Sequence, residues 1–146
     1  MPLKITLKPN ERMIINGSVI TNGTTTCKLT IENNVPVLRE KDIIKEKDAC
    51  SPCTRIYFCI QLMYIDKINL TLHHDTYWKL VRDLLDAAPS FLSLTDQIGE
   101  QVVSERYYQA LKLTKALINC EREVIQNELK RTPGIRPGEQ NDPFRP

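Results

Sequence analysis

The sequence predicts an α+β fold, with an N-terminal antiparallel β meander followed by a C-terminal helical region of three to four helices. Two observations support this prediction. In the first forty residues, stretches of alternating polar and apolar residues surround two Asn-Gly pairs, which tolerate the positive φ angles of tight hairpin turns. After about residue 50, apolar residues recur three and four positions apart, the spacing of one helix face. We therefore divide the chain into a β subdomain (1–48), a helical subdomain (49–130) and a tail (131–146).

The first strand is predicted in "LKITLK", where side chains alternate between two faces. The inward set is Leu3, Ile5 and Leu7, and the outward set is Lys4, Thr6 and Lys8. Pro9-Asn10 then turns the chain. The outward face of this strand is therefore expected to carry two lysines toward solvent.

Further strands are predicted around Asn16-Gly17, around Asn22-Gly23 and in "TTCKLTI". Both Asn-Gly pairs form tight hairpins only if the strand between them is very short, so a bulge at one of them is the alternative. In "VPVL", Pro36 indicates an edge strand. An exposed edge there leaves open a homodimer formed by sheet extension.

A helix is predicted from Ser51-Pro52, an N-cap followed by a first-turn proline, through Asp66. Its run "RIYFCIQLMYI" also suits a buried strand, but the start signal and the length favour a buried helix. The next helix runs from about Leu72 to Ala88, and Pro89 ends it.

The last helical stretch begins near Asp96 and is clear from Arg106, with Gly99 as a candidate break. Its apolar stripe is Tyr107, Ala110, Leu111, Thr114, Leu117, Ile118, Val124 and Ile125. Most of this stripe is expected in the core, and part of it, with Tyr108, is available for a partner. The tail "RTPGIRPGEQNDPFRP" is rich in proline and glycine and is expected to be disordered.

Composition excludes a strongly basic nucleic-acid protein, because 20 Lys and Arg face 18 Asp and Glu. Any nucleic-acid site must therefore be a local cluster. The longest apolar run, "IYFCIQLMYI", is about half of what a bilayer span needs, and no cleavable signal precedes it, so we expect no membrane association. Five cysteines, an odd number, fit reduced thiols, and we expect a cytoplasmic protein.

Candidate chemistry in the sequence is sparse. Cys50 and Cys53 of "CSPC" have no second pair at zinc-ligand spacing, so we interpret them as ordinary residues at a helix start. His73 and His74 are adjacent and face different directions, so we interpret them as solvated residues near a helix end. Catalytic elbows and phosphate-binding loops are missing, so we predict neither an enzyme nor a cofactor nor a metal.

Basic residues gather in the predicted β region, on the first strand and in "VLREKDIIKEK". Acidic residues stand among them, namely Glu11, Glu40, Asp42 and Glu46. On composition alone, a solvated and charge-balanced surface is the better interpretation.

A family resemblance favours the alternative interpretation, a nucleic-acid site. Four stretches carry it: "MPLKITLKPNERMIINGSVITNG", "NNVPVLREKDII", "TRIYFCIQLMYID" and "ERYYQALKLTKALINCEREVI". In order and spacing they resemble the FlbT family of flagellin post-transcriptional regulators. The resemblance implies a small cytoplasmic protein of flagellum biogenesis that binds the 5′ untranslated region of a flagellin mRNA. It implies repression of translation or faster mRNA decay, although some members act positively, and a functional partner in FlaF. The "CSPC" pair departs from the family pattern.

A second resemblance concerns the RNA site. "Strand, turn, Glu-Arg-x-Ile-Ile, Asn-Gly" ending in "VLREKDI" is similar to the small mRNA-binding β protein CsrA, in which basic residues of the first strand and of a Val-x-Arg-Glu segment clamp RNA. It points to Lys4 and Arg39, to which we add Lys8, Arg12 and Lys41 by proximity. The helical half has no counterpart there. Two other classes stay open, a protein-interaction adaptor and a zinc or redox protein.

Overall fold

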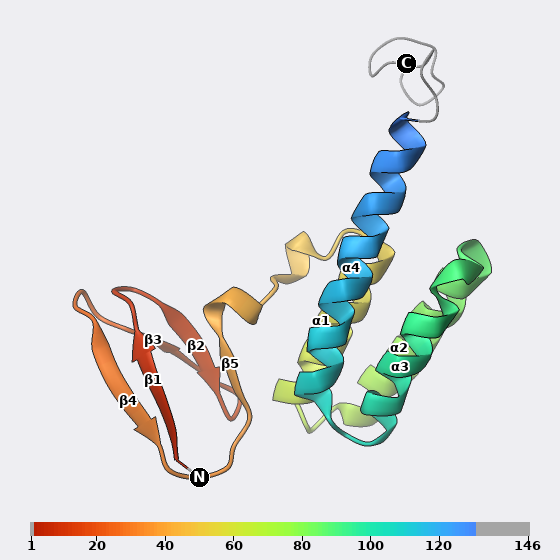
Figure 1. The fold of residues 1–146 in the computed structure, drawn as a ribbon. Coiled ribbons are helices and arrows are strands. Elements are labelled where there is room, and N and C mark those ends of the chain that lie inside the picture. The colour runs from red at the N-terminus through yellow and green to blue at the C-terminus, as the bar shows by residue number, and fades with distance from the viewer. Residues whose placement is uncertain (1, 131–146) are drawn as a thin grey trace.

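The computed structural model describes residues 2–130, and the predicted disorder of the tail falls outside them. The strands are β1 (Leu3–Leu7), β2 (Arg12–Ile15), β3 (Ser18–Thr21), β4 (Cys27–Ile31) and β5 (Val37–Arg39). The helices are η1 (Glu40–Asp42), η2 (Glu46–Asp48), α1 (Pro52–Ile65), α2 (Leu70–Ala87), η3 (Pro89–Phe91), α3 (Leu92–Val103) and α4 (Tyr107–Lys130). Figure 1 shows the strands on one side and the α-helices on the other, joined through η1 and η2. The predicted α+β class is confirmed.

The strands pair antiparallel in two small sheets rather than in one continuous meander. β1 pairs with β4, with Leu3 opposite Ile31 and Leu7 opposite Cys27. The second sheet has the order β3-β2-β5, which places β5 at an edge as Pro36 indicated. The order departs from a meander because both faces of β2 are buried. Met13 packs with Ile5 and Leu7 of β1, while Ile14 packs into the helical core.

The two Asn-Gly pairs have different structures. Asn16 and Gly17 have φ angles of 51° and 87° and form the tight turn between β2 and β3, as predicted. The tip of this turn lies against α1, since a Cβ on Gly17 would be 3.2 Å from the Ile65 carbonyl oxygen. Asn22 instead holds the loop between β3 and β4, where its Nδ2 donates to the carbonyl oxygens of Lys8 (2.8 Å) and Thr25 (2.9 Å).

α1 resolves the ambiguity between helix and strand in favour of the helix. Ser51 is its N-cap in a capping box with Thr54, and Pro52 follows in the first turn. The buried apolar face includes Ile56, Ile60 and Met63, each 0% exposed. The start signal read from the sequence was therefore decisive.

The break before α4 is not at Gly99. Gly99 lies inside α3, where a Cβ would stand 3.3 Å from the Trp78 ring, so the glycine serves close packing of α3 on α2. The chain instead turns at Glu105, whose φ is 59°.

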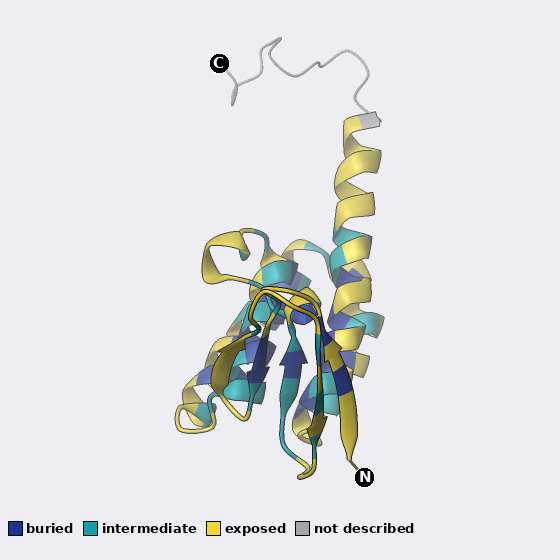
Figure 2. Cartoon of the chain, turned by 90° about the vertical axis from the view of Figure 1, so that its left-hand side faces the viewer, coloured by how far each residue is buried: buried dark blue, intermediate teal, exposed yellow. Residues whose placement is uncertain are grey.

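The main core is formed by α1 to α4 and includes Ile14 and Leu38 from the second sheet. A smaller cluster of Ile5, Leu7 and Met13 lies between the two sheets. The buried stripe of α4 extends only to Leu117; the last turns project beyond the body and are exposed in Figure 2. Most of the stripe is therefore in the core, as predicted. Val124 (47% exposed) and Ile125 (53%) form the part that stays on the surface, because no other described element reaches that far.

Candidate nucleic-acid interface

Arg39 connects the two sheets. Its Nη2 donates to the Thr6 carbonyl oxygen at 2.8 Å and to Glu11 Oε2 at 3.0 Å. Glu11 Oε1 in turn accepts from the Lys8 backbone N–H at 2.8 Å. These contacts, the Lys8 hydrogen bond first, lower the pKa of the Glu11 carboxyl. Arg39 Nε is buried without a hydrogen-bond partner among the described residues. Part of the guanidinium thus has a structural role.

The five residues predicted to bind RNA do not form one cluster. Lys4 and Arg39 line a hollow of about 320 Å³ between β1, β5, α1 and α4, which we call the junction hollow. Lys8 and Lys41 line a separate hollow of about 410 Å³. Arg12 is exposed and lines neither of these two hollows.

The hollow that contains Lys8 and Lys41 is charge-balanced. Its lining includes Glu11 and Glu40 as well as the two lysines. Glu40 Oε1 also accepts from the Arg12 backbone N–H at 2.6 Å. This balance matches the solvated-surface interpretation, so the hollow is the weaker place for a polyanion.

The junction hollow combines cations with aromatic rings. Besides Lys4 and Arg39 it is lined by Tyr64 of α1 and Tyr108 of α4, whose ring centroids are 6.3 Å apart. Lys112 Nζ lies 5.0 Å from the centroid of the Tyr108 ring, within cation–π range. Proteins that bind single-stranded nucleic acid use the same combination, with aromatic faces for bases and cations for phosphates.

Tyr64, Tyr108 and Lys112 were missed as site residues. Tyr64 stands in the apolar run of α1, and the sequence pattern of Tyr108 indicates a partner-binding stripe rather than an RNA site. The available signal was the spacing of Tyr108 and Lys112, four residues apart on one face of a helix. The Tyr64 hydroxyl also bonds the backbone N–H and carbonyl of Val37, at 3.2 and 3.3 Å.

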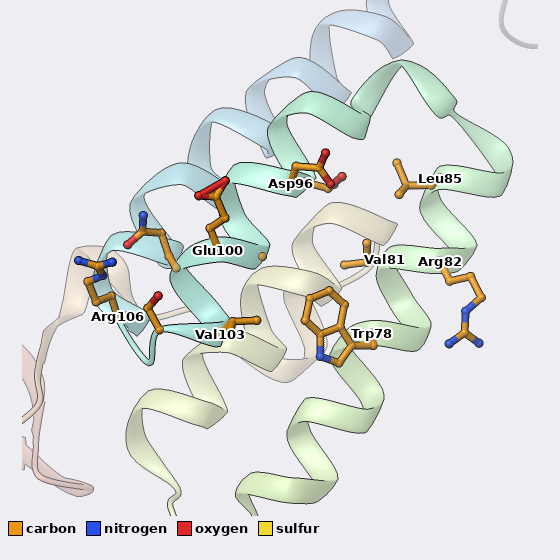
Figure 3. Close-up of a pocket in the computed structure, with 12 residues that line it drawn as sticks. Trp78, Val81, Arg82, Leu85, Asp96, Glu100, Val103 and Arg106 are labelled. Atoms are coloured by element: carbon orange, nitrogen blue, oxygen red, sulfur yellow. The ribbon is translucent and has the colours of Figure 1, made fainter.

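A third hollow, of about 660 Å³, lies between α2 and α3 (Figure 3). Trp78 and Val103 contribute apolar surface and are 39% and 69% exposed. Charges of both signs surround them, from Arg82, Asp96, Glu100 and Arg106. Mixed charge around an apolar surface suits a protein partner better than a polyanion.

The two cysteines of "CSPC" lie in different environments, and so do the two adjacent histidines. Cys50 is exposed, and its Sγ donates to the Lys47 carbonyl oxygen, whereas Cys53 is buried, which raises the pKa of its thiol to about 12. His74 contacts the Tyr107 hydroxyl, while His73 contacts Asp66 at 3.0 Å. The prediction of solvated histidines was wrong for His73, which is 9% exposed because α2 packs that face on α1.

Two further features of the described chain bear on function. Within residues 2–130, no group of three or more His, Cys, Asp or Glu side chains is placed to hold a metal ion. None of the helices in the same range is both long and apolar enough to cross a bilayer.

Comparison with known proteins decides the family. The family model described as "Flagellar protein FlbT" matches residues 3–125. The chain belongs to the FlbT family. This confirms the resemblance found in the four sequence stretches, and the match includes both the strands and the helices that form the junction hollow.

Individual FlbT relatives match at similar length. A protein of Rhodopseudomonas palustris (strain TIE-1), named "Probable flagellum biosynthesis repressor protein FlbT", is 38% identical over 125 residues, which cover 86% of this chain and 98% of the relative. A relative described as "Probable flagellum biosynthesis repressor protein FlbT 1" in Bradyrhizobium diazoefficiens is 41% identical, with 85% of each chain covered. The "Flagellum biosynthesis repressor protein FlbT" of Caulobacter vibrioides (strain ATCC 19089 / CIP 103742 / CB 15) is 34% identical, with 86% of this chain and 90% of the relative covered. No solved structure matches the chain.

Proposed function

We propose that this FlbT-family protein represses flagellin synthesis after transcription, by binding the 5′ untranslated region of flagellin mRNA. The names of its relatives support a repressor role in flagellum biosynthesis. The observation that supports direct RNA binding is the junction hollow, where Lys4 and Arg39 lie beside Tyr64 and Tyr108. Unpaired bases of a leader loop stack on the tyrosines, and Lys4 contacts phosphates.

Arg39 has two roles in this proposal. Its hydrogen bonds to Thr6 and Glu11 fix the relative position of the two sheets, and it also lines the hollow, with its charge partly balanced by Glu11. Occupation of a leader near the ribosome-binding site then blocks initiation sterically or exposes the transcript to decay. Neither outcome needs a catalytic group on this chain.

The test is a gel-shift titration of purified protein with a flagellin leader RNA. Tyr108→Ala is expected to weaken binding by about 1–3 kcal/mol, the usual contribution of one stacked base. Lys4→Ala should weaken it less and reduce its salt dependence. Lys79→Ala, on the exposed surface of α2, is the matched control. Unchanged affinity for both site variants would remove the junction hollow as the RNA site.

A second candidate is an adaptor that docks FlaF or another flagellar regulator and contacts RNA only indirectly. The hollow between α2 and α3 favours it, because Trp78 and Val103 expose apolar surface there. Purified protein with leader RNA alone separates the two functions. If RNA binding appears only after the partner protein is added, and Trp78→Ala abolishes this RNA binding, the adaptor function is the correct one.

A further inference from the structure

The cations of α4 lie on one face of the helix. Among the side chains of α4 that the structure describes, the positively charged ones are Lys112, Lys115 and Arg122. With Tyr108 and Asn119 they stand at positions 108, 112, 115, 119 and 122, which is the repeat of a single helix face. We call these five residues the α4 basic stripe.

The α4 basic stripe faces the segment that joins sheets to helices. Lys115, Asn119 and Arg122 line a hollow of about 400 Å³ together with Lys41 and Asp42 of η1. Asp42 also lines the junction hollow, which contains Tyr108 at the other end of the stripe. The two hollows therefore adjoin at Asp42 and follow the same side of α4.

Positive charge predominates along this path. The two linings contain the cations Lys4, Arg39, Lys41, Lys115 and Arg122, and their carboxylate is Asp42. Arg39 is ion-paired with Glu11, which lies outside both linings, so Lys4, Lys41 and Arg122 carry the excess of positive charge. Asp42 is buried and ion-paired with Lys115.

The carboxylate of Glu121, the neighbour of Arg122 in the chain, points away from this path and toward the start of α1. Its carboxylate accepts from the Ser51 hydroxyl and from the Cys53 backbone N–H, at the start of α1. The path thus keeps its positive charge as far as Arg122, beyond which Glu123 follows on the exposed end of α4.

We propose that the α4 basic stripe extends the RNA site, so that a single strand whose bases stack at Tyr64 and Tyr108 continues along α4 toward Arg122. This inference rests on the proposed RNA binding. Arg122 lies fourteen positions after Tyr108, which at 1.5 Å per residue is about 21 Å of helix. A row of cations of that length matches an extended phosphate backbone, and the tyrosine pair at one end matches its bases.

The test compares variants of the full-length protein on one flagellin leader RNA. The double variant Lys112→Ala/Arg122→Ala removes two exposed cations and spares Lys115, whose loss would leave Asp42 without its ion-pair partner. We expect affinity to fall about tenfold and the slope of log K against log salt to become shallower by roughly 0.7 for each phosphate that is no longer neutralised. Lys79→Ala is the control, and circular dichroism melting verifies the fold of each variant. Ultraviolet crosslinking with peptide mapping should place contacts between Tyr108 and Arg122.

The outcomes are distinguishable. If the double variant binds like the wild type and no crosslink falls on α4 beyond Tyr108, while Tyr108→Ala loses affinity, the extension of the RNA site along α4 is rejected and the proposed function stands. If the wild-type protein does not bind the leader RNA, both proposals are rejected.

Discussion

Arg39 couples the two sheets through a single side chain. Its Nη2 reaches the Thr6 carbonyl oxygen of β1 and the Glu11 carboxylate, which precedes β2. A sequence pattern identified Arg39 as functionally interesting but gave no information on these partners, because Thr6 and Glu11 are separated from it by 33 and 28 positions. A residue chosen for RNA contact is thus also a structural one.

Arg39→Ala is therefore expected to lower stability as well as RNA affinity. Loss of the two charge-assisted hydrogen bonds should reduce the free energy of unfolding by about 1–2 kcal/mol. Arg39→Lys retains the charge but lacks the planar fork, so it should recover part of the RNA affinity and little of the stability. Urea unfolding followed by circular dichroism measures the first quantity, and a gel shift the second. Equal stability of all three proteins would contradict the structural role.

Gly17→Ala is expected to destabilise the protein by about 1–2 kcal/mol, since an L-residue with a side chain disfavours the left-handed region. Contact of the new methyl with the Ile65 carbonyl oxygen adds to that cost. Gly23→Ala is a matched control, because a Cβ there meets nothing within 4 Å. The midpoint of urea denaturation should fall for the first variant and stay nearly constant for the second.

The thiols should differ in reactivity. Burial raises the pKa of Cys53 and of Cys59 to about 12, so both stay protonated at pH 8, whereas Cys50 is exposed. We expect iodoacetamide at pH 8 to modify Cys50 first, with Cys53 and Cys59 modified only after urea is added. Peptide mass spectrometry after timed labelling reads out each site. Rapid native modification of Cys53 would contradict its burial.

At the scale of elements, the start of α1 is held by two kinds of contact. The capping box of Ser51 and Thr54 is local and could be read from the sequence. The second contact comes from Glu121 of α4. Its carboxylate accepts hydrogen bonds from the Ser51 hydroxyl at 2.6 Å and from the Cys53 backbone N–H at 3.2 Å. An anion at a helix N-terminus is favoured, so this contact also attaches α4 to α1.

Glu121→Ala should therefore cost about 1 kcal/mol, comparable to loss of a helix cap. Its neighbour Glu123→Ala, on the exposed face, is expected to change stability by less than about 0.5 kcal/mol. Thermal melting of both variants in the same buffer gives the comparison. Similar melting temperatures would show that Glu121 contributes nothing to the attachment.

Local sequence signals predicted the helices and strands better than they predicted which of these elements pair or pack together. Asn16-Gly17 and Ser51-Pro52 act within a few residues, so the first hairpin and the start of α1 were found. The pairing of β1 with β4 could not be, because it depends on enclosing Met13 between two sheets. Gly99 was misread for the same reason: its function is to admit the Trp78 ring from another helix.

At the scale of the whole molecule, the junction hollow exists because the sheets dock on the helices. Lys4, Tyr64 and Tyr108 come from three distant parts of the chain, so no sequence motif contains them together. The docking is fixed by hydrogen bonds from α1 to the joining segment. Tyr57 donates to the Asp42 carbonyl oxygen at 2.6 Å, and the Gln61 amide exchanges two bonds of 2.9 Å with the backbone of Ile44.

Salt dependence tests the site as a whole. If Lys4, Lys41, Lys112 and Arg122 each neutralise one phosphate, log K should fall against log salt with a slope of about −3, at roughly −0.7 per contact on a single strand. Three contacts would give a slope of about −2 on the same basis. Anisotropy titrations of leader RNA between low and moderate sodium chloride measure it. A slope near zero would mean that phosphates are not neutralised.

The Tyr64 hydroxyl has a consequence for behaviour at high concentration. It occupies the outward N–H and carbonyl of Val37, the position on β5 where another chain would add its own strand. The homodimer by sheet extension would have to displace it. A phenylalanine at position 64 would leave those backbone groups bare, and such a chain should tend to associate edge to edge and precipitate on storage.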